Sequence, residues 1–327
     1  MQELNEKIWV DLAINPDFLT ALKDFTAVFS EENHHPVSLG KDQNFVHQLL
    51  YWCSQAAGTE LEQADLIANV WILFQNAAQL LDTIEDGDAI EGPAKKYSPG
   101  ELINISTGMI ILAQLVLSKL ENEFQIDPAA ANDLRTQFNR QILIMCGGQH
   151  QDLRNHETSL DECWQITEAK SGEFFSLACY AVARLGTDDA EILNRYKQFG
   201  FQIGTIIQIK DDITGLWDEN INQSDLAKSK NSLPVVYALE VLPDNQANLL
   251  RNLITNPYSD TAISTARNII IESGAVLYLS MEIEKRKLIA KNLLSEIFHF
   301  EKPEAAQQLA RILDHVSSME EKAIIPE

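Results

Sequence analysis

Apolar residues recur roughly every three or four positions along most of the chain, which is the spacing of a helix face buried against its neighbours. Strict alternation of apolar and polar residues is rare, so the pattern does not favour a sheet. Several apolar segments are long and apolar on more than one face, which is typical of helices in the middle of a bundle. We expect helices at Asn44–Ala57, Glu60–Asp86, Pro99–Phe124, Ala129–Asp152, Ser159–Leu185, Ala190–Leu216, Leu233–Leu242, Asp244–Thr255, Ser259–Phe298 and Pro303–Ser317.

Local signals support the starts of these helices. Ser98 and Asp127 each precede a proline, so their side chains can cap helices whose first residue is proline. Ser159, followed three residues later by Glu162, fits a capping box. No stretch rich in proline, glycine and serine interrupts the chain. The fold class that we expect is therefore all-α, a single large helical bundle forming one domain over residues 1–327.

Composition and charge narrow the classes of partner. The chain has 327 residues, of which 45% are hydrophobic, too many for global disorder. It carries 48 Asp and Glu against 25 Lys and Arg, a formal net charge of −23. This charge repels phosphate backbones and anionic membrane faces, so we expect no nucleic-acid partner. The apolar stretch Met109–Leu120 is shorter than the ~20 residues of a membrane span, so we also expect no stable membrane insertion.

The first residues and the cysteines bear on location. No basic segment followed by an apolar run opens the sequence, so we expect no signal peptide and a cytoplasmic protein. Cys53, Cys146, Cys163 and Cys179 lie far apart, and none is part of a CxxC pair. We interpret them as reduced residues of the core, because disulfides and zinc sites need closer or paired spacings.

Two groups of acidic residues stand at the ends of long apolar helices. In the first, Asp82 and Asp86 are four residues apart and share a helix face, and Gly87 is expected to end the helix. In the second, Asp211 and Asp212 follow another apolar stretch. Either group alone could be a solvated polar helix end. Two of them in one helical chain predict facing clusters that hold Mg²⁺ and a diphosphate.

Short motifs accompany both clusters in a fixed order. They are Gly40-Lys41, Gln75, Asp82–Asp86, Gly148-Gln149-His150-Gln151-Asp152-Leu153, Lys170-Ser171-Gly172, Gln208–Asp212 and Lys230-Asn231-Ser232-Leu233-Pro234. In order and composition they resemble the motifs of the trans-isoprenyl diphosphate synthase (polyprenyl synthetase) family, from residue 38 to the end. The resemblance implies an isoprenoid synthase-like helical bundle, Mg²⁺ as cofactor, an allylic prenyl diphosphate as substrate and a homodimer.

The resemblance also implies a role for each matching residue. Asp82, Asp86, Asp211 and Asp212 would bind Mg²⁺ and, with Lys170, form the catalytic set. The residues that would bind substrate are Lys41, Gln75, Ala77, Ala78, Gln149, Asp152, Gln208 and Lys230. Ala77 and Ala78 stand where aromatic residues shorten the pocket in the family, so their small side chains imply room for a long prenyl chain.

Other positions depart from the family's pattern. Thr83 and Gly215 stand where the two acidic motifs usually have Asp. Ile90 and Glu91 replace a pair of arginines, and the arginines usual after Lys41 are missing. Arginine binds phosphate through a planar fork of donors that neither residue supplies. We therefore expect a degenerate isopentenyl diphosphate site beside a better preserved allylic diphosphate site.

The group that attacks the allylic cation distinguishes the functions left open. A Mg²⁺-dependent prenyltransferase would join the allylic chain to an acceptor, by default isopentenyl diphosphate, and this is the function we favour. A class I terpene cyclase would use the substrate's own double bonds. A peptide side chain is another acceptor, as in competence-pheromone prenyltransferases of this fold. A regulatory subunit with decayed motifs is disfavoured, because unneeded buried acids are costly.

Overall fold

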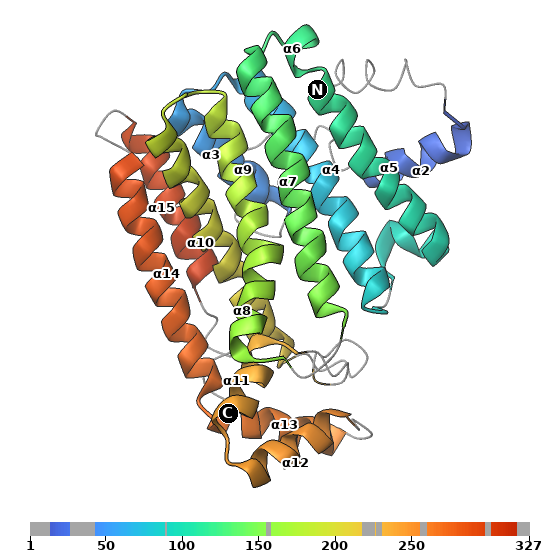
Figure 1. Ribbon diagram of the computed structural model, residues 1–327, viewed down its shortest axis with the longest axis vertical. Helices are drawn as coiled ribbons and strands as arrows, with labels where there is room; N and C mark the ends of the chain where they lie inside the picture. Colours follow the sequence, from blue (N-terminus) through green and yellow to red (C-terminus); the bar gives the residue numbers. More distant parts are fainter. Residues whose placement is uncertain are drawn as a thin grey trace. The chain divides into compact units, whose positions relative to one another are not determined.

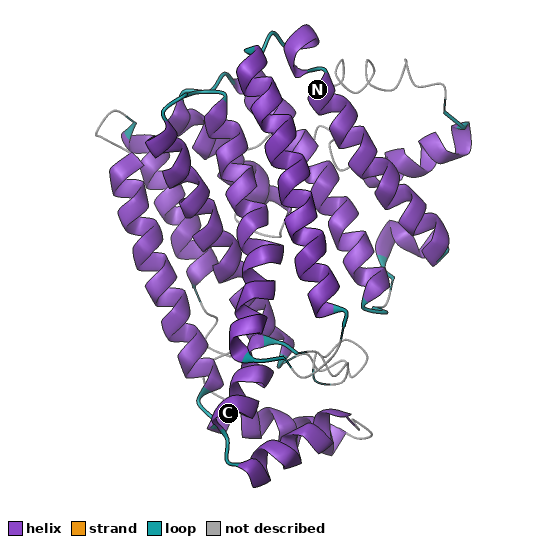
Figure 2. Cartoon of the chain, viewed as in Figure 1, coloured by secondary structure: helices purple, strands orange, loops and turns teal. Residues whose placement is uncertain are grey.

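The computed structural model describes residues 14–26, 43–88, 90–154, 158–217, 226, 231–255, 260–297 and 302–318 (Figure 1). Every regular element within these ranges is helical (Figure 2), so the all-α prediction is confirmed. The helices are α2 (Pro16–Thr26), α3 (Gln43–Ala57), α4 (Leu61–Glu85), the 3₁₀ helix η3 (Gly92–Lys96), α5 (Pro99–Ser118), α6 (Leu120–Glu123), α7 (Pro128–Asp152), α8 (Leu160–Thr167), the π-helical turn η4 (Glu168–Gly172), α9 (Glu173–Arg184), α10 (Ala190–Gly215), α11 (Leu233–Val241), α12 (Asp244–Thr255), α13 (Asp260–Glu272), α14 (Ala275–Ile297) and α15 (Pro303–Ser317).

The chain divides into two compact units. The first comprises Met1–Tyr51 and Glu60–Gln137, and the second comprises Trp52–Thr59 and Phe138–Glu327. The division passes within α3 and within α7, so each of these helices contributes to both units. A single domain over the whole chain stays a prediction.

In the first unit, α4 and α2 both pack against α5. α4 buries the large side chains Trp71 and Phe74, as its apolar faces predict. At the end of α2, Tyr97 Oη donates to Asp24 Oδ2 over 2.5 Å, and Lys96 Nζ lies 2.6 Å from the same oxygen. The hydrogen bonds from Lys96 and Tyr97 hold the pKa of the Asp24 carboxyl below its ordinary value. This cluster ties α2 to the segment that follows the first acidic group.

In the second unit, α10 packs against both α9 and α14, and α15 packs on α10 and α14 (Figure 1). Two glycines bring α10 close to the preceding helices. A Cβ atom on Gly200 would overlap the main-chain carbonyl of Phe175, and one on Gly204 would overlap that of Ser171. The absence of side chains at these two positions therefore sets how closely α10 approaches α9 and the π-helical turn.

The capping signals are confirmed. Ser98 and Glu101 form a capping box at the start of α5, and Ser159 and Glu162 form one at the start of α8. Asp127 Oδ2 accepts hydrogen bonds from the first backbone N–H groups of α7, over 2.9 and 3.0 Å. These contacts satisfy N–H groups that have no partner inside the helix, which is why the predicted starts agree with the structure.

Some predicted helices are wrong in extent. The helix predicted from Ser259 to Phe298 is two helices over the described residues 260–297, α13 and α14, because Gly274 at the break adopts φ +86°, a conformation that ends a helix. The predicted helix from Pro99 to Phe124 is interrupted at Lys119, between α5 and α6. The predicted helix from Ser159 to Leu185 contains the π-helical turn. α2 is not among the expected helices, although Asn15 Oδ1 caps it by accepting from two backbone N–H groups.

The expectation about apolar length is also corrected. By length and composition alone, α5 could cross a membrane, with a mean hydropathy of 1.6 over a window that is 44% buried. A buried core helix meets the same criteria, and α5 packs against α4. The absence of stable membrane insertion stays a prediction.

The cysteines are free thiols. Cys53, Cys163 and Cys179 are buried as expected, whereas Cys146 is exposed, because it falls on an outward position of α7. Cys53 and Cys179 lie with their Sγ atoms 3.8 Å apart, and burial raises the pKa of Cys53 well above its ordinary value. A buried thiol with a raised pKa is inert, in agreement with a structural role.

Candidate functional site

The first acidic group ends α4 in the first unit. Gly87 adopts φ +70° and donates its N–H to Ile84 O over 3.2 Å, while the N–H of Asp88 donates to Thr83 O over 2.9 Å. This pair of bonds is the Schellman arrangement, which a left-handed glycine permits. The prediction that Gly87 ends the helix is confirmed, and the turn keeps Asp86 and Asp88 beside the helix end.

Carboxylates in this position oppose the helix dipole. Asp82 and Asp86 are half-buried, Glu85 is exposed, and all three lie at the C-terminal end of α4, where the partial charge is negative. Thr83 adds no charge, and its Oγ1 donates to Gln79 O over 2.8 Å within the helix. A cation would offset both the mutual repulsion and the dipole, so this set of oxygen donors fits Mg²⁺.

Three predicted substrate residues precede Asp82 on α4. Ala77 is fully buried, and Gln75 and Ala78 are half-buried. Gln75 and Ala78 stand seven and four residues before Asp82. Gln75, Ala78 and Asp82 therefore lie on one face of the helix. The small Ala78 side chain leaves that face without bulk one turn before the acidic group. A deep prenyl pocket here stays a prediction.

In the second unit, Asp212 is buried within a network at the end of α10. Its Oδ1 accepts from Gln208 Nε2 over 2.8 Å, and its Oδ2 accepts from the backbone N–H of Leu233 over 2.9 Å. Leu233 begins α11, so the carboxylate joins the end of α10 to the positive N-terminus of α11. Asp211 beside it is exposed. The two acids therefore differ: Asp212 is bonded within the protein through both oxygens, whereas Asp211 lies at the surface.

The π-helical turn extends this network. Ser171 Oγ donates to Gln208 Oε1 over 2.7 Å, which completes a path from the turn through Gln208 to Asp212. Lys170 Nζ lies 2.7 Å from Asp152 Oδ2, at the end of α7. The structure thus brings together Lys170 with Asp152, and Gln208 with Asp212. Ser171 is a polar contact that the sequence analysis did not single out, although its place in the Lys170-Ser171-Gly172 motif was a signal.

Glycines allow α7 and α10 to approach the turn. A Cβ atom on Gly148 would lie 3.0 Å from Ala169 Cβ, and one on Gly172 would lie 2.9 Å from Phe201 Cε2. Gly147, next to Gly148, faces open space. π-helical turns are rare and often occur at functional sites. Here the turn aims Lys170 and Ser171 at two different elements, the ends of α7 and of α10.

Cys163 lies close to the acidic residues of this region. Its thiol is nearly buried, and its Sγ lies 3.3 Å from Asn231 O. Burial, and then the nearby carboxylates of Asp212 and Asp152, raise the pKa of the Cys163 thiol far above its ordinary value. The carboxylates of Asp212 and Asp152 therefore both lie near enough to Cys163 to disfavour its thiolate.

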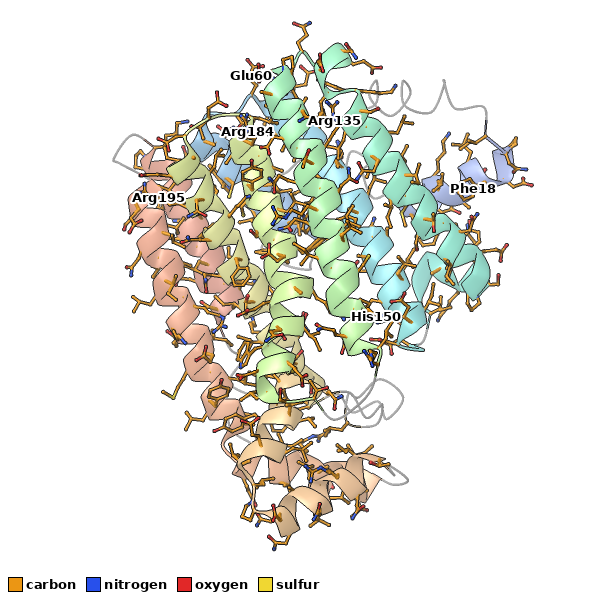
Figure 3. All side chains as sticks on the ribbon, in the orientation of Figure 1. Phe18, Glu60, Arg135, His150, Arg184 and Arg195 are labelled. Atoms are coloured by element: carbon orange, nitrogen blue, oxygen red, sulfur yellow. The ribbon has the colours of Figure 1, made fainter. Side chains whose placement is uncertain are left out.

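Gln149, Lys41 and Lys230 complete the predicted substrate residues. Gln149 is half-buried on the last turns of α7, and His150 beside it is exposed. His150 is labelled near the lower end of that helix in Figure 3. Lys41 and Lys230 lie outside the described residues. That the two acidic groups face each other also stays a prediction.

A metal at either group would depend on its other ligands. Among the described residues, no three His, Cys, Asp or Glu side chains gather closely enough to hold a metal by themselves. Mg²⁺ usually binds one or two carboxylates and completes its shell with water and substrate phosphates. The oxygen donors of Asp82, Asp86 and Asp211 fit that manner of binding, in which the diphosphate itself supplies ligands.

The sequence is similar to proteins of known families. The family model described as "Polyprenyl synthetase" matches residues 41–270. The chain is 25% identical over 211 residues to "Tryptophan prenyltransferase ComQ" of Bacillus spizizenii, covering 64% of this chain and 71% of that protein. It is 26% identical over 203 residues to "Geranylgeranyl diphosphate synthase" of Mycobacterium tuberculosis, covering 58% and 57%. It is 25% identical over 279 residues to "Phomopsene synthase" of Phomopsis amygdali, covering 79% of this chain but 36% of that protein.

Solved structures share the fold. A polyprenyl synthetase from Streptomyces coelicolor superposes with a TM-score of 0.77 at 21% identity, covering 96% of this chain and 98% of that one. A geranylgeranyl pyrophosphate synthase from Corynebacterium glutamicum, complexed with calcium and isoprenyl diphosphate, superposes with a TM-score of 0.73 at 19% identity, covering 97% and 94%. At these identities the likeness establishes the all-α architecture.

Proposed function

This chain belongs to the polyprenyl synthetase family of prenyl-transferring enzymes, and we propose that it is a Mg²⁺-dependent prenyltransferase that ionises an allylic prenyl diphosphate and joins the chain to an acceptor. The observation that carries the proposal lies in the second unit. Lys170 is held 2.7 Å from Asp152, next to the path from Ser171 through Gln208 to Asp212.

The charged residues would have different roles in binding the diphosphate. Lys170 would bind a diphosphate oxygen, and Asp152 would keep its ammonium group in place until the substrate arrives. Asp82, Asp86 and Asp211 would hold Mg²⁺, and we infer a more structural part for Asp212, whose oxygens accept from Gln208 and Leu233. Bound Mg²⁺ would neutralise the diphosphate and so stabilise it as a leaving group. The related structure with calcium and isoprenyl diphosphate supports a divalent metal.

The apolar part of the site has a separate task. An allylic cation reacts with water, so it needs a dry pocket until the acceptor attacks. The apolar face of α4 that ends at Asp82, with Ala77 and Ala78 near its end, would supply such a lining. Its small side chains leave room for a long prenyl chain.

The residues after the first acidic group bear on the acceptor. Glu91 is exposed and, with Ile90, stands where the family resemblance implies arginines that bind the second diphosphate. An acceptor without a diphosphate is favoured by this replacement, and the similarity to a tryptophan prenyltransferase supports an acceptor that contains tryptophan. A terpene cyclase is the second candidate, supported by the match to phomopsene synthase. We also propose a homodimer, from the family resemblance, and a cytoplasmic location.

A product assay tests the proposal. Purified protein would be incubated with Mg²⁺ and geranylgeranyl diphosphate, alone, with isopentenyl diphosphate, or with a tryptophan-containing peptide, and the products identified by mass spectrometry. A longer diphosphate or a prenylated peptide would support the transferase. A hydrocarbon formed without any acceptor would overturn it in favour of the cyclase. The absence of turnover and of diphosphate binding would argue against enzymatic function altogether.

A further inference from the structure

The π-helical turn Glu168–Gly172 carries Lys170 and Ser171, and the backbone N–H of Glu173 donates to Glu168 O across it. Such turns are rare and often occur at functional sites. We propose that Arg286, on α14, is a positioning residue that holds the turn through Glu168 and so sets where Lys170 and Ser171 meet the diphosphate. This inference rests on the proposed function, because the effect is read out at the diphosphate site.

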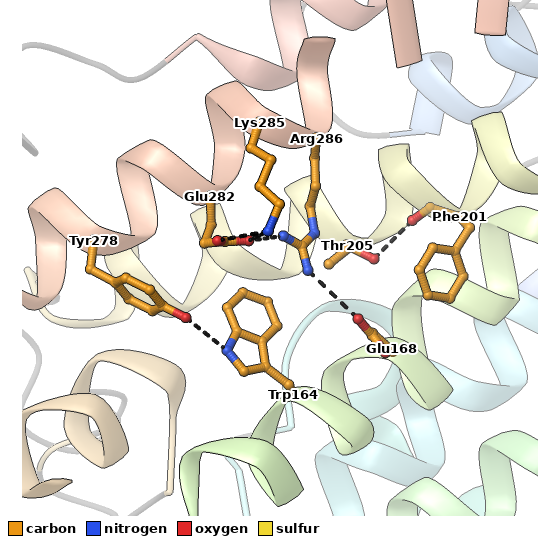
Figure 4. A network of polar contacts seen from close by, with 8 residues as sticks. All are labelled: Trp164, Glu168, Phe201, Thr205, Tyr278, Glu282, Lys285 and Arg286. Atoms are coloured by element: carbon orange, nitrogen blue, oxygen red, sulfur yellow. Dashed lines mark hydrogen bonds and ion pairs between the residues drawn. The ribbon is translucent and has the colours of Figure 1, made fainter. Parts of the chain in front are cut away.

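Arg286 is a nearly buried cation with specific partners. Its Nη2 lies 3.6 Å from Glu168 Oε1, its Nη1 donates to Glu282 Oε2, and its guanidinium lies 4.5 Å from the centre of the Trp164 ring (Figure 4). A guanidinium cannot lose its proton in a protein, so a buried one must be paired. Glu282, on the same helix, thus holds the guanidinium of Arg286 by a hydrogen bond. The side chain of Arg286 extends from α14 to the junction between α8 and the π-helical turn.

Glu168 is partly exposed and forms an ion pair with Arg286. Burial raises the pKa of the Glu168 carboxyl, the nearby Glu173 and Glu282 raise it further, and Arg286 opposes them by favouring the ionised form. Arg286 is the cation among these neighbours, so the charge of Glu168 links the start of the turn to α14. Lys170 follows two residues later, and its direction is set by the same backbone.

A second contact fixes the same junction. Trp164 stands four residues before Glu168, so both side chains present one face to α14. Trp164 Nε1 donates to Tyr278 Oη over 3.2 Å, and Tyr278 in turn stacks on Tyr237 of α11, with ring centres 4.4 Å apart. α14 therefore contacts the junction at Tyr278 and again at Arg286.

α10 supports the turn from its own side. Gly172 lies against the Phe201 ring and the Thr205 hydroxyl, whose Oγ1 donates to Phe201 O over 2.8 Å (Figure 4). The turn is therefore in contact with α10 through Gly172 and with α14 through Glu168. If the Arg286 contact were lost, relaxation of the turn toward α-helical geometry would rotate the following side chains by up to about 100°.

Binding of inorganic pyrophosphate tests this role. Calorimetry with Mg²⁺ and pyrophosphate would compare wild type, Arg286→Gln, Glu168→Gln, the double variant and Lys285→Gln. Lys285 is the matched control, because it is exposed and its ion pair among the described residues is with the same Glu282, at 3.2 Å. We expect Arg286→Gln and Glu168→Gln each to weaken pyrophosphate binding about tenfold or more, because small displacements in a site have large effects.

The pattern across variants distinguishes positioning from stability. If Arg286 acts through Glu168, the double variant binds no more weakly than Arg286→Gln alone, and Lys285→Gln binds as wild type does. A residue that only stabilises the fold would reduce the number of binding sites per chain and leave the dissociation constant unchanged. That result, or wild-type affinity in both single variants, would overturn the inference. If wild type itself does not bind pyrophosphate with Mg²⁺, it is the proposed function that fails.

Discussion

Replacing Gly204 with alanine should separate α10 from the π-helical turn. The added Cβ atom would lie 2.8 Å from the carbonyl carbon of Ser171 and 2.9 Å from Phe175 Cδ2, where ordinary contacts are 3.4–4 Å. The nearest atoms belong to the main chain, so they cannot rotate away as a flexible side chain would. The two elements must move apart, which would also stretch the 2.7 Å hydrogen bond between Ser171 and Gln208.

The magnitude follows from two opposing effects. Alanine is better than glycine in a helix by about 1 kcal/mol, which favours the variant. Overpacking a dense interior typically costs about 1–3 kcal/mol, and the upper end applies where backbone is in the way. We therefore expect Gly204→Ala to lower the free energy of unfolding by about 2 kcal/mol.

Gly147 supplies the matched control. It lies in α7 of the same unit, and a Cβ atom there would have no neighbour within 4 Å. Gly147→Ala should therefore gain the helical preference without the overlap and raise the free energy of unfolding by up to about 1 kcal/mol. The same chemical change should thus shift stability in opposite directions at the two positions.

Urea unfolding followed by circular dichroism measures both variants. The midpoint should fall for Gly204→Ala and rise for Gly147→Ala, with little change in slope, because the surface exposed on unfolding stays similar. If Gly204→Ala unfolded at the wild-type urea concentration or above it, the close approach of α10 to the turn would be refuted. A parallel shift of both variants would show that helix preference alone is being measured.

Further predictions concern the acids and one tyrosine. Asp82→Ala and Asp211→Ala should each abolish Mg²⁺-dependent turnover, measured as pyrophosphate release, and normal activity in either would exclude the metal-binding role. Asp212→Asn should lower the free energy of unfolding by about 2 kcal/mol, because one of the two accepting oxygens becomes an NH₂ group that cannot accept the N–H bond made there, and unchanged urea unfolding would contradict the buried network. The depressed pKa of Asp24 means that its stabilising contribution is present above the ordinary carboxyl pKa and is lost as pH falls through the folded-state value. Tyr97→Phe removes one hydrogen-bond donor to Asp24. The urea midpoints of this variant should therefore differ from those of wild type most at neutral pH and converge with them in acid.

The second acidic group shows how far sequence patterns reach. Its position at the end of a long apolar helix could be predicted, because helical periodicity and like charges are local features of the chain. The difference between Asp211 and Asp212 could not, since these neighbours have the same side chain. Asp212 is buried because its oxygens accept from Gln208 and from the start of α11 at Leu233, a contact between elements separated in sequence.

The sequence by itself determined the helical class, the capped helix starts, the glycine that ends α4 and the ordered motifs that indicate the family, because each depends on residues within a few positions of one another. The tertiary structure alone decided which glycine faces open space and which meets a neighbour, as Gly147 and Gly148 show. It also paired Lys170 with Asp152 and placed Arg286 against Glu168. Those contacts depend on burial and on the approach of separate helices, whose distances no local pattern specifies.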